Sequence, residues 1–205
     1  MKPRTLAILA GFSYLVIFFA AIFANFMVLE AILENPLETV QQERFLVGLG
    51  IFAFMLTVIF DAVVAWALYE LYREHKLSGL STIFRLIHAT VMGVAIAMLP
   101  LALDLTSNQE ILQQVEIFNT IWLLGLFFFG VHLILLAKIL DKPQIIRILL
   151  LLAGIMYMVD TTAHFMLPNY EDYASVFLML VAVPSILGEM SFAIWLLVKG
   201  GKDLH

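Results

Sequence analysis

Glu189 lies in the middle of the apolar run 184–199, whose other residues mostly suit hydrocarbon. An ionisable side chain inside a membrane span usually faces the interior of the protein and pairs with another polar group. Asp61, His88 and His132 lie in three other long apolar runs. Two imidazoles and two carboxylates are a ligand set that suits Zn²⁺, Fe²⁺ or Mn²⁺, so these four residues predict a divalent metal site.

Further polar residues extend this hypothetical site. Asp160 and His164 are four residues apart and share one helical face, so His164 is a further candidate metal ligand. A metal-bound water could attack an ester or amide of a lipid-like molecule, with Glu189 or Asp61 as the base and Tyr157 as a third candidate catalytic residue. The candidate residues for binding the small molecule itself are Tyr14, Arg85, Asp160 and Trp195.

Three other interpretations of these residues stay open. His88 and His132 could be the axial ligands of a b-type haem. Without a metal, Glu189 and Asp61 could exchange protons in a transporter or a receptor for a small molecule, with Arg85 holding an anionic group. In the third interpretation Arg85 pairs with Glu189 or Asp61, and the histidines and tyrosines complete a hydrogen-bonded core with a structural role.

The amino-acid composition indicates that the segments carrying these residues lie in a lipid bilayer. The chain has 205 residues, of which 63% are hydrophobic and 13% charged, and its mean hydropathy is +1.01. Soluble domains have about 45–50% apolar and about 25% charged residues, so the partner of this chain is a lipid bilayer. Each long apolar run can supply the about 20 residues that a helix needs to cross a bilayer. We therefore expect an all-α, single-domain bundle over residues 1–205, with transmembrane helices at 5–29, 45–72, 80–103, 117–138, 145–167 and 173–198.

Several classes of site are excluded by residue usage. The chain contains no cysteine, which excludes disulfides, thiolate metal sites and cysteine nucleophiles. The net charge of −5 argues against nucleic-acid binding, which requires a basic surface. The first apolar run is longer than the core of a signal peptide, so we interpret it as an uncleaved membrane helix.

The distribution of basic residues predicts the orientation in the membrane. Arg44 is the only basic residue expected on one side of the bundle, where it accompanies eight acidic residues. The opposite side carries Lys2, Arg4, Arg73, Lys76, Lys138, Lys142, Arg147, Lys199 and Lys202. Cytoplasmic loops of membrane proteins are enriched in Lys and Arg, so we expect a multi-pass protein of the cell membrane with both termini in the cytoplasm.

Depth and helical spacing together predict a shared polar cavity. At ~1.5 Å per residue, the polar side chains of all six spans lie ~9–18 Å from the cytoplasmic ends. Helical periodicity places them on six faces that we expect to point inward. These faces are Gly11, Tyr14, Phe18, Ala21 and Asn25; Gly50, Phe54, Thr57 and Asp61; Ser81, Arg85, His88 and Met92; Trp122, Gly125, Phe129 and His132; Tyr157, Asp160, Thr161 and His164; and Ser185, Gly188, Glu189 and Phe192.

Two prolines and several aromatic residues add local expectations. Pro184 removes a backbone hydrogen bond to the carbonyl of Leu180, which predicts a kink beside the polar layer, and Pro100 predicts another near the outer end of its span. Four aromatic side chains near the cytoplasmic ends are expected to be interfacial anchors: Trp66, Tyr69, Tyr72 and Trp195.

Short motifs in five spans carry a family resemblance. They are GFSYL at 11–15, FRL at 84–86, FFGVHL at 128–133, GIMYMVD at 154–160, and Gly188-Glu189 followed by WLLVKG at 195–200. In these motifs the chain resembles a bacterial membrane-protein family known as domain of unknown function 4386. The resemblance implies a small polytopic membrane protein and supplies no activity, so function has to be argued from the site.

Overall fold

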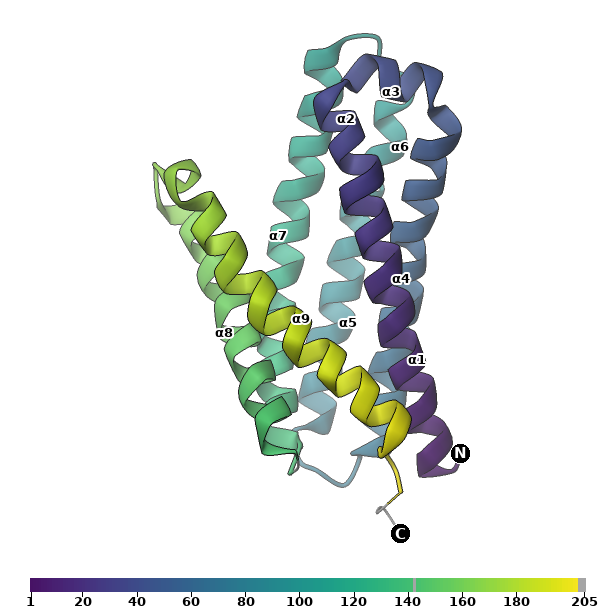
Figure 1. The fold of residues 1–205 in the computed structure, drawn as a ribbon, viewed down its shortest axis with the longest axis vertical. Helices are drawn as coiled ribbons and strands as arrows, with labels where there is room; N and C mark the ends of the chain where they lie inside the picture. The colour runs from purple at the N-terminus through teal and green to yellow at the C-terminus, as the bar shows by residue number, and fades with distance from the viewer. Residues whose placement is uncertain (142, 203–205) are drawn as a thin grey trace.

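The computed structural model describes residues 1–141 and 143–202, which form a bundle of helices without strands (Figure 1). The first span comprises α1 (Pro3–Ile22), the π-helical η1 (Phe23–Leu29) and α2 (Glu30–Glu34). The short α3 (Pro36–Gln42) leads into α4 (Arg44–Leu71), and α5 (Ser78–Ile96) and α6 (Leu99–Ala102) form the third span. The remaining elements are α7 (Asn108–Ile139), α8 (Gln144–Met166), the 3₁₀ turn η2 (Tyr170–Tyr173) and α9 (Ala174–Val198).

Six helical segments are long and apolar enough to cross a membrane, which confirms the all-α, six-helix fold class. Two of them extend well beyond the predicted boundaries. The first membrane-length segment runs over Pro3–Glu34, and the fourth begins at Asn108 rather than near residue 117. The hydroxyl of Ser107 accepts a hydrogen bond from the backbone N–H of Glu110, which caps α7 at this earlier position. A hydropathy pattern identifies only the stretch of a helix that lies within the bilayer. Polar helical turns that extend beyond the bilayer are therefore missed.

The six spans close into a ring in chain order. α1, α4, α5, α7, α8 and α9 each pack against their neighbours along the chain, and α9 returns to pack against α1. The start of α1 and the end of α9 lie at one end of the bundle, and the hairpin of α8 and α9 diverges from the other helices toward the opposite end (Figure 1). This ring brings the inward faces of all six spans toward one interior.

Two apolar cores occupy this interior, and the polar residues lie between them. α4 shows the order, because Val64 belongs to the core near the start of α1 and Phe54 to the core nearer the opposite end of the bundle. Asp61 lies between these positions on the same buried face. The polar layer is therefore enclosed above and below by packed hydrophobic side chains.

Glycines allow the closest helix contacts in the bundle. A Cβ atom added at Gly130 of α7 would lie 2.6 Å from the carbonyl oxygen of Gly154 in α8, and the reverse distance is also 2.6 Å. Such close backbone approach is typical of membrane helices, whose association depends on van der Waals packing. These two glycines bring α8 against α7 just below the level of Tyr157.

The two prolines differ in their effect on the backbone. α9 continues through Pro184 as one helix, so this residue ends no element, and the kink expected there stays a prediction. Pro100 lies in the first turn of α6, after α5 has ended at Ile96. Proline fits the first turn of a helix because its missing N–H would have had no partner there.

Candidate functional site

Arg85 of α5 is the centre of the buried polar layer. Its Nη2 donates to Oδ1 of Asp61 at 2.6 Å, and its Nη1 donates to the hydroxyl of Tyr14 at 2.7 Å. The same Nη1 lies 3.2 Å from Nε2 of His132. Of the two carboxylates that could have paired with this guanidinium, the structure selects Asp61 rather than Glu189.

Aromatic rings complete the surroundings of the guanidinium. Cζ of Arg85 lies 4.7 Å from the ring centroid of Tyr14 and 5.3 Å from that of Phe129. Cations are attracted to the faces of aromatic rings, especially in places shielded from water. Hydrogen bonds and ring contacts therefore hold Arg85 between α1, α4 and α7.

Both histidines of the polar layer make contacts through each ring nitrogen. Nδ1 of His132 lies 3.0 Å from the carbonyl oxygen of Ser81, which can only accept, so this nitrogen carries a proton and Nε2 can accept from Arg85. Nδ1 of His88 lies 2.9 Å from the carbonyl oxygen of Gly125. Its Nε2 lies 3.5 Å from Oδ2 of Asp61. Both imidazoles thus position the Arg85–Asp61 pair.

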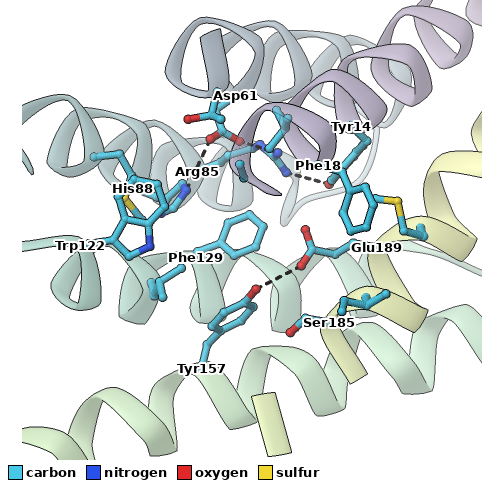
Figure 2. Close-up of a pocket in the computed structure, with 17 residues that line it drawn as sticks. Tyr14, Phe18, Asp61, Arg85, His88, Trp122, Phe129, Tyr157, Ser185 and Glu189 are labelled. Atoms are coloured by element: carbon cyan, nitrogen blue, oxygen red, sulfur yellow. Dashed lines mark hydrogen bonds and ion pairs between the residues drawn. The ribbon is translucent and has the colours of Figure 1, made fainter. Parts of the chain in front are cut away.

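Beside this network lies a cavity of about 180 Å³ lined by all six spans (Figure 2). Its lining includes thirteen residues of the inward faces predicted from helical spacing. These are Tyr14, Phe18, Ala21, Thr57, Asp61, Arg85, His88, Met92, Trp122, Phe129, Tyr157, Ser185 and Glu189. Helical periodicity therefore identified most of the lining without tertiary information.

Glu189 occupies the side of the cavity opposite the Arg85–Asp61 pair, next to Tyr157 and Ser185 (Figure 2). The hydroxyl of Tyr157 donates to Oε1 of Glu189 over 3.4 Å, which is a long hydrogen bond. No ion pair joins Glu189 to a Lys, Arg or His side chain of residues 1–141 or 143–202. The two carboxylates of the site therefore differ, because Asp61 has a cationic partner and Glu189 has none.

The arrangement does not suit the predicted metal centre. No three His, Asp or Glu side chains come together as a metal site within the described parts of the chain. Asp61 and His132 both bind Arg85, whose positive charge would oppose a metal cation between them. Glu189 lies across the cavity from His88 (Figure 2). The four predicted donors are thus near one another but do not converge on one point.

The haem interpretation meets a similar obstacle. His88 and His132 point their ring nitrogens at protein groups, and both rings pack against Phe129, with centroid distances of 4.7 and 5.8 Å. An axial ligand needs a free nitrogen that faces the iron. A porphyrin ring also requires more room than the cavity of about 180 Å³ provides.

Four predicted site residues do not line the cavity, and one of them is His132, which contacts Ser81 and Arg85 instead. Asp160 accepts a hydrogen bond from the hydroxyl of Tyr170 at 2.6 Å, and the ring of His164 packs against the same tyrosine at 4.7 Å. Trp195 stacks on Phe192 with a centroid distance of 6.1 Å and does not line the cavity. Asp160 and His164 belong instead to a cluster that secures η2 to the end of α8.

Some partners carried no assigned role in the sequence. Ser81 and Phe129 lie on predicted inward faces, yet periodicity did not show that they contact His132 and Arg85. Tyr170 had no detectable signal, because it follows the end of α8 in a short polar connection. Their roles depend on neighbours that are distant in sequence.

Comparison with known proteins agrees with this fold and with the motifs. The chain matches the model of the family described as domain of unknown function (DUF4386) over residues 9–200. It is 32% identical over 159 residues to an uncharacterized protein of Archaeoglobus fulgidus, with 75% of this chain and 83% of that protein covered. No solved structure matches the chain. The family match spans nearly the whole bundle, and the chain belongs to the DUF4386 family.

Proposed function

We propose that the protein binds an amphipathic small molecule inside the bilayer, with the polar head of the ligand in the cavity. The observation that carries this proposal is a cavity of about 180 Å³ with largely apolar walls and a half-buried carboxylate, Glu189, that forms no ion pair with a described Lys, Arg or His. An apolar cavity of about 150 Å³ is known to accept benzene, so this volume suits a polar head and the first carbons of a chain. Binding sites commonly combine apolar walls with a few polar groups in this way.

The lining also supports entry from the lipid. Phe18 on α1 and Met190 on α9 line the cavity and are partly exposed, and Ile186 on α9 is 48% exposed. The cavity therefore reaches the lipid-facing surface between α1 and α9, which separate above their crossing (Figure 1). A molecule dissolved in the bilayer could enter there with its apolar chain still in lipid.

The contacts of the polar layer favour recognition over metal-dependent hydrolysis. Arg85, Asp61 and both histidines are engaged with one another or with backbone carbonyls. Such mutual contacts hold side chains in one orientation, which is what a preorganised binding wall requires. They leave Glu189, Tyr157 and Ser185 as the polar groups that face a ligand.

A fluorescence experiment tests this proposal. Trp122 lines the cavity, so Trp66→Phe with Trp195→Phe leaves a single reporter there. This protein in lipid nanodiscs would be titrated with hexylamine, hexanol and hexanoate, and at least one is expected to change the Trp122 emission in a saturable manner. Ala21→Phe should abolish the response because the new ring fills the cavity, whereas Ala97→Phe, at an exposed position outside it, should not. A lack of response to all three probes would refute the proposal.

We also propose that both termini face the cytoplasm in the cell membrane. The start of α1 and the end of α9 share one end of the bundle with the turn between α4 and α5 (Figure 1). This turn contains Arg73 and Lys76. Lys142, which also supports this orientation, lies outside the described residues. A green fluorescent protein fused to the C-terminus should fluoresce and an alkaline phosphatase fusion should be inactive. The opposite pair of results would reverse the orientation.

A further inference from the structure

The end of the cavity beside α9 offers more hydrogen-bond acceptors than donors. The hydroxyl of Ser185 donates to the carbonyl oxygen of Val181 at 2.7 Å, so its oxygen can still accept. The hydroxyl of Tyr157 donates its proton toward Glu189 over 3.4 Å. An ionised carboxylate can accept about four hydrogen bonds, whereas Glu189 accepts this single long one from the described side chains. A ligand that donates hydrogen bonds would satisfy this end of the cavity.

The distribution of charge in the cavity also favours a ligand with a positively charged head. Arg85 and Asp61 form an ion pair whose side chains are 1% and 5% exposed, so each already has a partner of opposite sign. Glu189 forms no such pair with any described Lys, Arg or His. An unpaired carboxylate inside a membrane protein is costly, and either a proton or a cation relieves the cost.

Aromatic side chains surround the space next to this carboxylate. Phe18, Trp122 and Phe129 line the same cavity as Glu189 (Figure 2). Their faces attract a positive charge and also pack against a hydrocarbon chain. A molecule with a cationic head and an apolar body is complementary to both features.

We infer that Glu189 anchors the ammonium group of an amphipathic primary amine, with Tyr157 and Ser185 as further acceptors. An ammonium group has three N–H donors, and the three side chains offer oxygen atoms at one end of the cavity. The apolar part of the amine lies against Phe18 and Trp122 and extends toward the opening between α1 and α9. This inference rests on the proposed function and names the class of ligand for the same cavity.

Other head groups fit less well. An anionic head would meet the charge of Glu189, and the cation that could attract it, Arg85, is already paired with Asp61. A neutral alcohol supplies one hydrogen-bond donor and no charge, so it leaves Glu189 without a counter-ion. A protonated primary amine supplies both hydrogen-bond donors and the positive charge that Glu189 requires.

Protons compete with the amine for the same carboxylate. The other charged or titratable side chains that line the cavity are Tyr14 on α1, Asp61 on α4, Arg85 and His88 on α5, and Tyr157 on α8. The lining residues of α7 contain no titratable group. Glu171 and Asp172 belong to η2, before the start of α9, and do not line the cavity. Because a protonated Glu189 loses its attraction for ammonium, the affinity for the amine should fall as the pH is lowered.

The three probes of the Trp122 assay differ only in their head groups, so they test this inference directly. Hexylamine is expected to bind at least about tenfold more tightly than hexanol or hexanoate, as is typical of a buried charge pair. Glu189→Gln should weaken hexylamine binding by at least about tenfold and leave hexanol binding unchanged. Glu116→Gln removes one carboxylate from an exposed position of α7 and should change neither.

The possible failures are distinguishable. If none of the probes binds, the cavity is not a binding site and the proposed function fails with the inference. If hexanol or hexanoate binds as tightly as hexylamine, or if Glu189→Gln retains the amine affinity, only the ammonium assignment is overturned. Should Glu189→Gln not fold, as judged by gel filtration, the unmodified residue still decides the question. Hexylamine binding must then weaken as the pH is lowered from neutral to about 4, the ordinary range of a glutamate pKa, while hexanol binding stays constant, and parallel behaviour of both probes refutes the inference.

Discussion

Nη2 of Arg85 lies 2.6 Å from Oδ1 of Asp61, and both side chains are almost completely buried. The pair joins α5 to α4, and the hydrogen bond from Arg85 to Tyr14 extends the connection to α1. Because the partners lie on different helices, this network selects one relative position of α1, α4 and α5. The ion pair therefore forms a structural wall of the cavity, and Glu189 is the second carboxylate that lines it.

Asp61→Asn should lower the free energy of unfolding by about 3–5 kcal/mol, because it leaves the positive charge of Arg85 buried without a counter-charge. Chemical denaturation in detergent micelles, followed by circular dichroism, measures the change. The double replacement Asp61→Leu with Arg85→Met is the control, and it should be much less harmful because no isolated charge remains. Equal losses in both variants would contradict a stabilising role for the pair itself.

Gly130→Ala should destabilise the bundle by about 1–3 kcal/mol, because the added Cβ would lie 2.6 Å from the carbonyl oxygen of Gly154 and force α7 and α8 apart. Gly93→Ala is a matched control in the last turn of α5, where nothing lies within 4 Å of the added atom. It should raise stability by up to about 1 kcal/mol, because alanine favours the helix. The same denaturation assay measures both, and a neutral Gly130→Ala would show that this contact is not close.

Tyr170→Phe should loosen the connection between α8 and α9, because it removes the hydrogen bond to the buried carboxylate of Asp160. A buried acceptor without its donor costs about 1–3 kcal/mol. Hydrogen exchange followed by mass spectrometry should show faster exchange in residues 167–173, with little change in α5 and α7. The probes of the cavity should bind as before, and weaker binding would place this cluster in the site.

Protein purified from cells grown with added zinc, iron and manganese should contain none of these metals at one atom per chain. The reason is that Asp61 and His132 already bind Arg85, which lies where a shared cation would have to be. Inductively coupled plasma mass spectrometry gives the metal content. One equivalent of metal that is lost in both Glu189→Gln and His132→Ala would restore the metal-centre hypothesis.

Helical periodicity made the lining of the cavity predictable. Tyr14, Asp61, Arg85 and Glu189 stand on four of the six inward faces inferred from spacing alone, and all four line the cavity. A polar side chain in an apolar helix must avoid lipid, so its position on the helix already implies which face is turned inward. The six spans followed from length and hydropathy for the same reason, although polar helix turns beyond the bilayer, as at Asn108, were missed.

The partner of each polar residue was not predictable in this way. Sequence spacing left Arg85 free to pair with Asp61 or Glu189, and only the closure of the ring, with α4 beside α5 and α9 across the cavity, selected Asp61. The same packing directed His132 to Ser81 and Arg85, and Asp160 to Tyr170. The sequence by itself determined which residues are buried, because burial in a membrane depends on the chemistry of each residue and its helical face. The tertiary structure decided which of them meet, because pairing depends on how separate helices are placed in space.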